Sequence, residues 1–424
     1  MRVIYERCAG LDVHKKVVTA CRRDGKKQET KNFGTTTPDL LELVDWLSHW
    51  ECTHVAMEST GEYWKPIYNL LEGIFQVFLV NAKHVKQVPG YVTDMGSARW
   101  LAELMQHGLL KPSFIPPAPQ RDLRDLTRYR TNLVQERARI ANRIQKVLES
   151  ANIKLSSIAT DTFGVSGRAM LEAIVGGQAD PESMAQLAKG RMRNKIPELE
   201  KALTGLVREH HRFLLANQLT HMDFLDEQIT TMGARIEDQI KEMSNSQDKP
   251  FCDPDGTTPL KAQEAIELLD TIPGVDTRTA EVIVSELGVD MSRFPTAKHV
   301  SSWAGLSPGN HESAGKRYSG RTTKGNRALR SGLNQAAWAA SRTKDTYLSA
   351  QYHRLAGRRG KKRAIVAVAH SILVIAYHIL ERHQPYYELG GNFFDERKKE
   401  SVTQRLTKRL EKLGYQVKLE PVVA

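Results

Sequence analysis

The stretch CAGLDVHKK, residues 8–16, decides the fold of the first part of the chain. Its apolar run predicts a short buried strand that ends on a carboxylate, Asp12. Two more acids stand at or after other apolar runs: Glu58 in HVAMESTGEYW and Asp94 in VTDMGSARWLAEL. A carboxylate at the tip of a buried strand is costly unless a cation neutralises it. We therefore expect the three acids to converge on Mg²⁺, a hard ion that prefers oxygen ligands, and to support metal-assisted phosphoryl chemistry.

The segments around these acids alternate between strands and helices up to about residue 115. We expect a strand hairpin that turns at Asp24-Gly25, then a helix from Thr37. The following elements are a strand over 54–59, a helix over 63–73, a strand over 76–82 and a helix over 97–110. The order β-β-β-α-β-α-β-α predicts a mixed sheet with helices packed on it, which is the element order of the ribonuclease-H-like (RuvC-like) fold.

A fourth carboxylate one helical turn after Asp94 would share its helix face and complete a site for two metal ions. Ser97 stands at that position and offers only a neutral hydroxyl. We therefore expect a weaker second metal and slower cleavage than four acids would give.

The composition indicates a basic, globular protein of two or three domains. The chain has 424 residues, with 61 Lys and Arg against 49 Asp and Glu, which gives a net charge of +12. A basic excess of this size favours a polyanionic partner, most often nucleic acid. Four widely spaced cysteines and the absence of a signal peptide predict a reducing cytosol. The apolar stretch Ala364–Leu380 is 17 residues long and interrupted by histidines, so we expect a buried core helix rather than a membrane span.

The middle of the chain is predicted to be helical after a proline-rich break at FIPPAPQ, residues 114–120. Apolar residues recur every seventh position in an Arg-rich segment, at Leu126, Leu133, Ile140 and Val147. A second stripe follows at Met222, Leu225, Ile229, Met232 and Ile236. We expect an antiparallel arm that also assembles subunits; an intramolecular helical hairpin is the alternative.

A polar linker over 244–259 precedes two helices that flank the turn Ile272–Val275. This arrangement is similar to a helix-hairpin-helix, whose turn amides hold a DNA phosphate. Asp276 replaces the usual second glycine of that turn, so a purely structural helix pair is an equal alternative. From about Asn392 the chain is charged, and we expect a helix and a short strand there.

A glycine-rich, strongly basic loop around Gly315, Gly320 and Gly325 comes after the two helices that flank Ile272–Val275. Its flexible backbone and positive charge suit close approach to the phosphate backbone of a nucleic acid. Ser313, in HESAGKR, is a candidate nucleophile because neighbouring cations would stabilise an alkoxide and a pentacovalent phosphate. Ser307 and Ser319 are alternatives, and His311 is a candidate base. The predicted nucleic-acid contacts are Lys316, Arg317, Arg321, Lys324, Arg327, Arg330, Arg358, Arg359, Lys361 and Lys362.

These motifs together resemble the DEDD transposases of bacterial insertion sequences, in the branch of bridge-RNA-guided recombinases. The resemblance rests on GLDVHKK, AMESTGEYW, TDMGSARWLAELMQHGLL, IPGV and the run from Phe294 to Arg330, in order along most of the chain. It implies a RuvC-like catalytic domain over 1–115, a coiled-coil region over 116–243, a linker over 244–264, a C-terminal transposase domain with the serine loop over 265–390, and a charged tail over 391–424.

The resemblance also implies roles for individual residues. Asp12, Glu58 and Asp94 match three Mg²⁺-binding acids, and Ser313 matches a serine that becomes linked to DNA. The implied partners are double-stranded donor and target DNA, a structured noncoding guide RNA, and further copies of the chain in a dimer or tetramer, in the bacterial cytoplasm at the nucleoid. Two other functions stay open: a RuvC-like junction nuclease, and a nucleic-acid-binding protein weakened in catalysis by Ser97.

Overall fold

The computed structural model describes residues 2–59, 61–81, 85, 96–178, 180–245, 260–309 and 311–419. The chain divides into two compact units, Met1–Pro116 and Pro117–Ala424, and each is described by itself. Asp94 lies outside the described residues.

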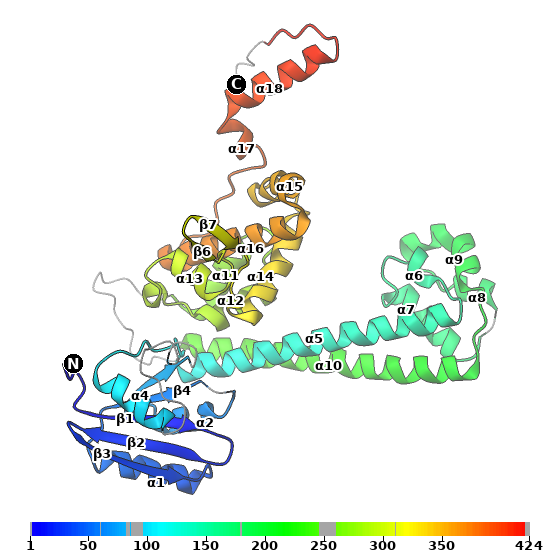
Figure 1. Cartoon of the computed structure of the whole chain (residues 1–424). Coiled ribbons are helices and arrows are strands. Elements are labelled where there is room, and N and C mark those ends of the chain that lie inside the picture. Colours follow the sequence, from blue (N-terminus) through cyan, green and yellow to red (C-terminus); the bar gives the residue numbers. More distant parts are fainter. Residues whose placement is uncertain are drawn as a thin grey trace. The chain divides into compact units, whose positions relative to one another are not determined.

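The first unit is built on a mixed five-stranded sheet in the order β3-β2-β1-β4-β5 (Figure 1). The strands are β1 (Arg7–Val13), β2 (Val18–Asp24), β3 (Lys27–Phe33), β4 (His54–Glu58) and β5 (Gln76–Val80). The first three strands pair antiparallel, whereas β1, β4 and β5 pair in parallel. The predicted mixed sheet is therefore confirmed, and the hairpin turns at Gly25, where φ is +58°.

Helices cover both faces of this sheet. On one face, α1 (Thr37–Ser48) and α2 (Trp64–Leu71) bury leucines against Leu11, Val55 and Met57. A capping box between Thr36 and Asp39 begins α1, as expected for a sequence with Asp in its first turn. On the other face, α4 (Ser97–Gln106) packs against β1 and β2.

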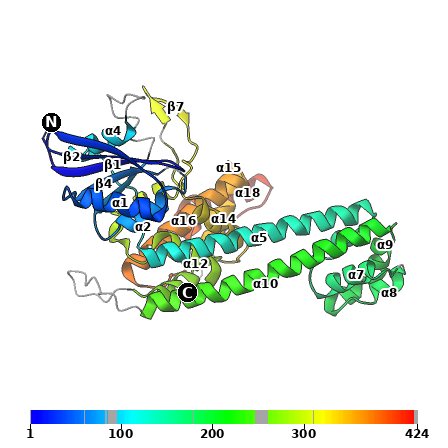
Figure 2. The same cartoon turned by 90° about the horizontal axis from the view of Figure 1, so that it is seen from below.

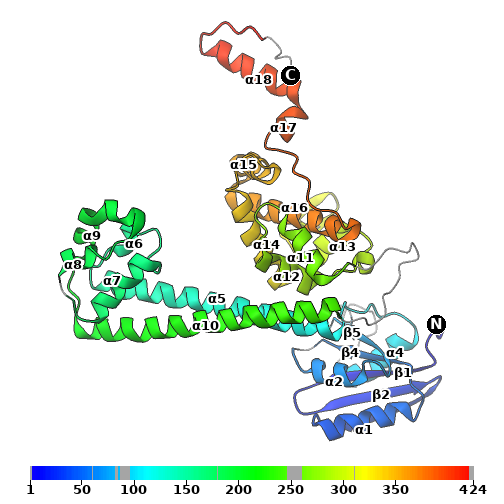
Figure 3. The same cartoon turned by 180° about the vertical axis from the view of Figure 1, so that it is seen from behind.

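The second unit contains a long arm made of two helices, α5 (Ala118–Ser150) and α10 (Glu209–Asn245), which lie side by side (Figure 2). At its far end the arm is closed by a group of short helices (Figure 3). These are α6 (Leu155–Ile158), α7 (Val165–Val175), α8 (Pro181–Ala185), the 3₁₀ helix η1 (Gly190–Lys195) and α9 (Ile196–Leu203). One apolar cluster runs through all these α-helices, so within one chain the arm is a helical hairpin.

The heptad stripe predicted for α5 is correct only in part. Leu133 and Ile140 are buried, but Leu126 and Val147 are only half-buried. Near the start of α5 the buried positions are instead Leu123, Thr127 and Arg130, together with Gln120. The difference arises because this part of α5 packs against α12 rather than only against α10.

The remaining helices of the second unit form a bundle around α16. They are α11 (Ala262–Asp270), α12 (Thr277–Leu287), the 3₁₀ helix η2 (Met291–Arg293), α13 (Ala297–Trp303), α14 (Arg327–Ala340), α15 (Tyr347–Arg359) and α16 (Lys361–Arg382), followed by α17 (Phe393–Glu396) and α18 (Lys399–Lys412). In the described part of the chain, α16 alone is long and apolar enough to cross a membrane. Its apolar residues, Ile372 and Leu373 among them, are buried against α13, α14 and α15, which is the pattern of a core helix.

The segment that was predicted to resemble a helix-hairpin-helix consists of α11, α12 and the turn between them. The turn between α11 and α12 packs against α14: a Cβ on Gly274 would lie 2.4 Å from the backbone nitrogen of Ala340. Asp276 caps α12 by accepting a hydrogen bond from the amide of Thr279 at 2.9 Å, so a carboxylate already occupies this helix start.

The prediction of a short strand after α18 is wrong, because residues 415–419 are irregular.

Candidate active site

Asp12 and Glu58 lie near the same ends of two neighbouring parallel strands: Asp12 is the last residue but one of β1, and Glu58 is the last residue of β4. The ladder between β1 and β4 pairs Gly10 with Ala56 and Leu11 with Met57. The ladder ends there, and Asp12 and Glu58 are the next residues on these two adjacent strands. Because side chains alternate along a strand, both acids lie on the same face as Gly10 and Ala56, which is the face that α4 covers.

The start of α4 lies at the same end of the sheet as these acids. Cys8 contacts Ala102, and a Cβ on Gly10 would lie only 2.3 Å from the carbonyl oxygen of Ala98. The helix therefore runs opposite to β1, and its first residue, Ser97, lies toward the Asp12 end. Glycine at position 10 is what allows this close approach.

Polar groups surround Asp12, whose side chain is 26% exposed. Nε2 of His14 lies 3.4 Å from one carboxylate oxygen of Asp12. The antiparallel partner of Asp12 is Thr19, whose hydroxyl donates to Oδ1 of Asn32 at 2.9 Å. His14 was not among the predicted site residues, although its position two residues after Asp12, directly after β1, is a usable signal.

The donor chemistry of this pair suits Mg²⁺, which is commonly held by one or two carboxylates together with substrate phosphates. Among the described residues no group of three or more His, Cys, Asp or Glu side chains gathers as a metal site. The described acids thus provide two carboxylates, and the third predicted ligand, Asp94, is not among the described residues.

The predicted serine loop forms a β-hairpin in the second unit. Strand β6 (His311–Ser313) pairs antiparallel with β7 (Lys316–Ser319), and Ser313 lies opposite Lys316. The two residues between the strands, Ala314 and Gly315, both have positive φ, at 48° and 74°. A two-residue turn of this kind fits the twist of a hairpin, but a left-handed conformation at Ala314 carries strain. Ser313 is therefore the last strand residue before a strained turn.

Four of the ten predicted nucleic-acid contacts line two pockets, five others are exposed, and the side chain of Arg317 lies outside the described part of the structure. Lys324, Arg327 and Arg330 line one pocket at the start of α14. Arg358 lines another, together with Arg354, Lys398 and Arg405, at α15 and α18. Lys316, Arg321, Arg359, Lys361 and Lys362 are exposed. These groups are candidate phosphate contacts.

Sequence analysis missed a cluster of charges where α5 meets α12. Glu286 is fully buried, and its carboxylate accepts hydrogen bonds from Arg128 at 2.7 and 2.9 Å. Arg124 lies one helical turn before Arg128, and its Nε is 3.2 Å from the same carboxylate. The signal in the sequence was the pair Arg124 and Arg128, four residues apart, in a segment that was interpreted only as a coiled coil.

Models of known protein families match two separate ranges of the chain. A model of DEDD transposases of the IS110 type matches residues 9–153, and a model described as "Transposase IS116/IS110/IS902 family" matches residues 266–353. The first range contains Asp12 and Glu58, and the second contains the β6–β7 hairpin. Together the two matches cover more than half of the chain.

Individual relatives point the same way. The chain is 24% identical over 385 residues to the transposase for insertion sequence element IS1111A of Coxiella burnetii, covering 89% of this chain and 90% of that protein. It is 29% identical over 195 residues to the pilin gene-inverting protein of Moraxella bovis. That match covers 44% of this chain and 59% of that protein, so the chain spans under two thirds of this relative's length. The two family matches, which together cover more than half of the chain, show that the chain belongs to the IS110 family of transposases.

Proposed function

We propose that the chain is an insertion-sequence transposase that cuts and rejoins donor and target DNA. The observation that carries the proposal is the parallel pairing of β1 with β4, which ends one residue before Asp12 and Glu58 and leaves both carboxylates at the sheet end where α4 begins. The sheet order is that expected of a RuvC-like domain, and the relatives are named for transposition and for gene inversion.

In this proposal Asp12 and Glu58 hold Mg²⁺, and Asp94 is the third ligand. When bound, the ion stabilises charge on the phosphate under attack. Asp94 is three residues before Ser97 in the sequence, and its role as a ligand rests on the family resemblance.

The serine is proposed to act as the nucleophile. Oγ of Ser313 attacks a DNA phosphorus, a bond from Oγ to phosphorus forms, and the bond to the departing deoxyribose oxygen breaks. That oxygen takes up the proton that the serine hydroxyl releases. A deoxyribose hydroxyl of the partner strand then attacks the phosphoserine, the strand is rejoined, and the serine regains its proton. The exposed cation Lys316 on the same hairpin favours a phosphate there.

Ser97 sets the expected level of activity. It is half-buried at the first position of α4, next to the end of the sheet that carries the two acids. A hydroxyl there supplies no negative charge for a second metal ion. We expect Ser97→Asp to raise the rate of cleavage, with the larger gain at low Mg²⁺ concentration.

The remaining parts of the proposal follow from the family. A structured noncoding RNA pairs with donor and target DNA, and the acids of one subunit work with the serine of another in a dimer or tetramer. The protein acts in the bacterial cytoplasm at the nucleoid.

The test uses full-length protein, Mg²⁺, the element's noncoding RNA and end-labelled donor and target DNA. The expected result is a recombinant product and a covalent protein–DNA adduct that maps to Ser313. Ser313→Ala should abolish the adduct, whereas Ser307→Ala, a serine in the same region, should retain it. Asp12→Asn should stop cleavage.

Two outcomes would replace this proposal with the alternatives. Cleavage that survives Ser313→Ala would indicate a junction nuclease. Tight DNA binding without cleavage, even in the Ser97→Asp variant, would indicate a binding protein.

A further inference from the structure

The pocket that Arg358 lines, here called the C-terminal pocket, has α15 on one side and α17 and α18 on the other. Its volume is about 630 Å³. Arg354 and Arg358 come from α15, Lys398 directly precedes α18, and Arg405 lies within α18. Among the described residues that line this pocket, Asp395 is the one acid, so four positive charges are gathered with one negative charge.

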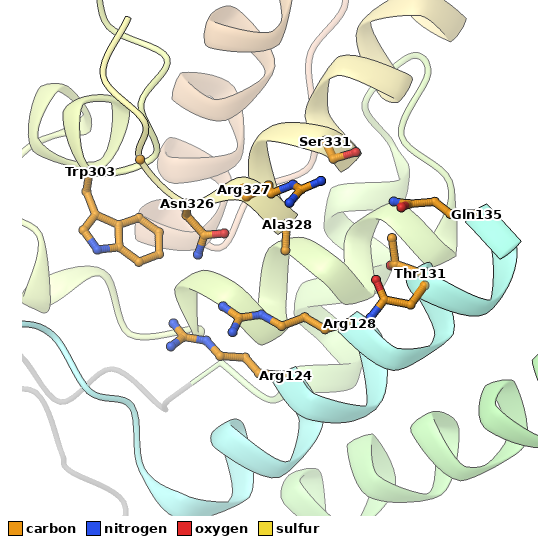
Figure 4. Close-up of a pocket in the computed structure, with 11 residues that line it drawn as sticks. Arg124, Arg128, Thr131, Gln135, Trp303, Asn326, Arg327, Ala328 and Ser331 are labelled. Atoms are coloured by element: carbon orange, nitrogen blue, oxygen red, sulfur yellow. The ribbon is translucent and has the colours of Figure 1, made fainter. Parts of the chain in front are cut away.

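These cations differ from the arginines that line another pocket of the same unit. Figure 4 shows that pocket, which lies above Glu286 between α5 and α14, with Arg124 and Arg128 extending from α5. Both arginines lie within 3.2 Å of the buried Glu286 carboxylate, which compensates them. None of the four cations of the C-terminal pocket pairs with a carboxylate of the described residues. Like charges on neighbouring turns and facing helices repel, so an anion between them is favoured.

Helix α18 is connected to the bundle through α17. Phe394 of α17 stacks on Tyr347 of α15 with ring centroids 5.1 Å apart, and the Arg354 guanidinium lies 5.1 Å from the centre of the Phe394 ring. No hydrogen bond or ion pair between described residues joins α18 itself to α15. The leucines of α18 are also exposed, Leu406 by 51% and Leu410 by 42%. Because α18 makes few stabilising contacts with α15, its docking there has a low intrinsic stability.

The basic surface continues from the C-terminal pocket along the chain. Where α15 ends and α16 begins, four more cations are exposed and pair with no carboxylate of the described residues: Arg359, Lys361, Lys362 and Arg363. A small anion such as free phosphate would compensate the pocket and leave this junction uncompensated. A row of phosphates would compensate both, so the charge pattern favours an extended polyanion.

The other groups in the lining favour the backbone of duplex DNA. The Phe394 ring, the one aromatic group among the described lining residues, is already stacked on Tyr347 and contacted by Arg354, so it is not a platform for unpaired bases. Ser401 is the one neutral hydrogen-bonding side chain among them. An RNA helix is recognised largely through its 2′-hydroxyls, which need such neutral groups, whereas cations alone suffice for DNA phosphates.

We propose that the C-terminal pocket and the basic junction of α15 and α16 bind the phosphate backbone of duplex DNA, and that the bound phosphates hold α18 on α15 as a clasp. Phosphates between the two walls replace the repulsion between their cations by attraction. The inference rests on the proposed function, in which duplex DNA is the substrate. It adds a contact that is independent of sequence and a response of the C-terminal helix to bound DNA.

The test uses full-length protein and a fluorescein-labelled blunt DNA duplex, and it follows amide hydrogen exchange in α18 by mass spectrometry. Free duplex at about 100 times its Kd should slow this exchange by up to about 100-fold. Arg405→Gln, and Arg358→Gln on the opposite wall, should each remove most of the protection and lower the salt dependence of duplex binding by about one phosphate contact. Arg409→Gln, at an exposed arginine of α18 that is not among the lining residues, is the matched control and should keep the protection.

Protection of α18 by duplex DNA that both pocket variants lose and Arg409→Gln keeps supports the inference. Unchanged exchange in α18, or protection that survives in either pocket variant, overturns it. An equal loss in Arg409→Gln also overturns it, because the charge of the helix rather than the pocket would then be responsible.

An RNA duplex of the same sequence serves as the competing ligand. Equal or stronger protection by this RNA overturns the inference, since the occupant would then be RNA. Recombination by a protein whose α18 does not respond to duplex DNA refutes the clasp and leaves the proposed function standing. Protection of α18 in a protein that does not recombine DNA does the reverse.

Discussion

Removal of Glu286 should destabilise the second unit strongly. In Glu286→Ala, Arg128 and Asn326 lose their acceptor, and Arg124, whose side chain is 12% exposed, loses its nearest counter-charge. Breaking a buried ion pair by removing one partner costs about 3–5 kcal/mol. Because the Arg128 side chain is 43% exposed and regains water, we expect a loss of about 3 kcal/mol, near the lower end.

Glu286→Gln separates the loss of charge from the loss of shape. The amide oxygen of the glutamine still accepts one or two hydrogen bonds. Its amide nitrogen is a donor and faces the donor groups of Arg128 and Asn326, so the hydrogen bonds on that side are lost. We expect a loss of about 1.5–3 kcal/mol, the contribution of a charged hydrogen bond. The measurement is urea unfolding followed by the helical circular dichroism signal, with the midpoint and slope fitted separately.

A second bidentate pair provides the matched control. Arg168 donates to Asp223 at 2.6 and 2.7 Å, but the Asp223 side chain is 55% exposed. Asp223→Asn should lower the free energy of unfolding by less than about 1 kcal/mol. Equal losses for Asp223→Asn and Glu286→Ala would show that burial of Glu286 does not set its contribution, and the argument would be refuted.

Three further predictions concern single positions. Gly10→Ala places a Cβ 2.3 Å from the backbone of α4 and should cost at least about 1–3 kcal/mol in thermal unfolding, whereas Gly233→Ala, with open space around it, should be neutral or stabilising. Burial raises the pKa of Cys8 to about 12 and that of Cys52 to about 11, so at pH 8 mass spectrometry should find both unalkylated by iodoacetamide until denaturant is added; fast labelling of the native protein would contradict this. Asp276→Ala should lower stability by about 1 kcal/mol through the lost cap without weakening DNA binding, and weaker binding would restore a phosphate role for that turn.

The sheet could be predicted from the sequence because its signals are local. The apolar runs before Asp12 and Glu58 are buried on both faces of the sheet, and the capping residues before α1 mark the start of that helix. The register that sets Asp12 beside Glu58 could not be predicted, since it depends on pairing between strands more than 40 residues apart. The sequence indicated which acids are candidate ligands, and the strand pairing places two of them near the ends of adjacent strands.

The arm shows where local reasoning fails. A heptad places apolar residues at Leu126 and Val147, yet the structure buries Arg130 instead, in an ion pair with Glu281 at 2.6 Å. Arginine in a helix ordinarily indicates an exposed face, so Arg130 did not indicate that this part of α5 is buried against α12. The pocket above Glu286 was missed for the same reason, because its residues come from three helices and are mostly polar.

The ionic contact between α5 and Glu286 also orders events during synthesis. Arg128 and Glu286 are 158 residues apart in the chain. At about 5–20 residues per second, the ribosome needs roughly 8–32 s to deliver the carboxylate after the arginine has been made. Throughout that interval the first half of α5 is a nascent cationic helix without its acceptor. The first half of α5 is therefore translated long before its ionic contact can form, and final assembly of the second unit waits for the ribosome to pass α12.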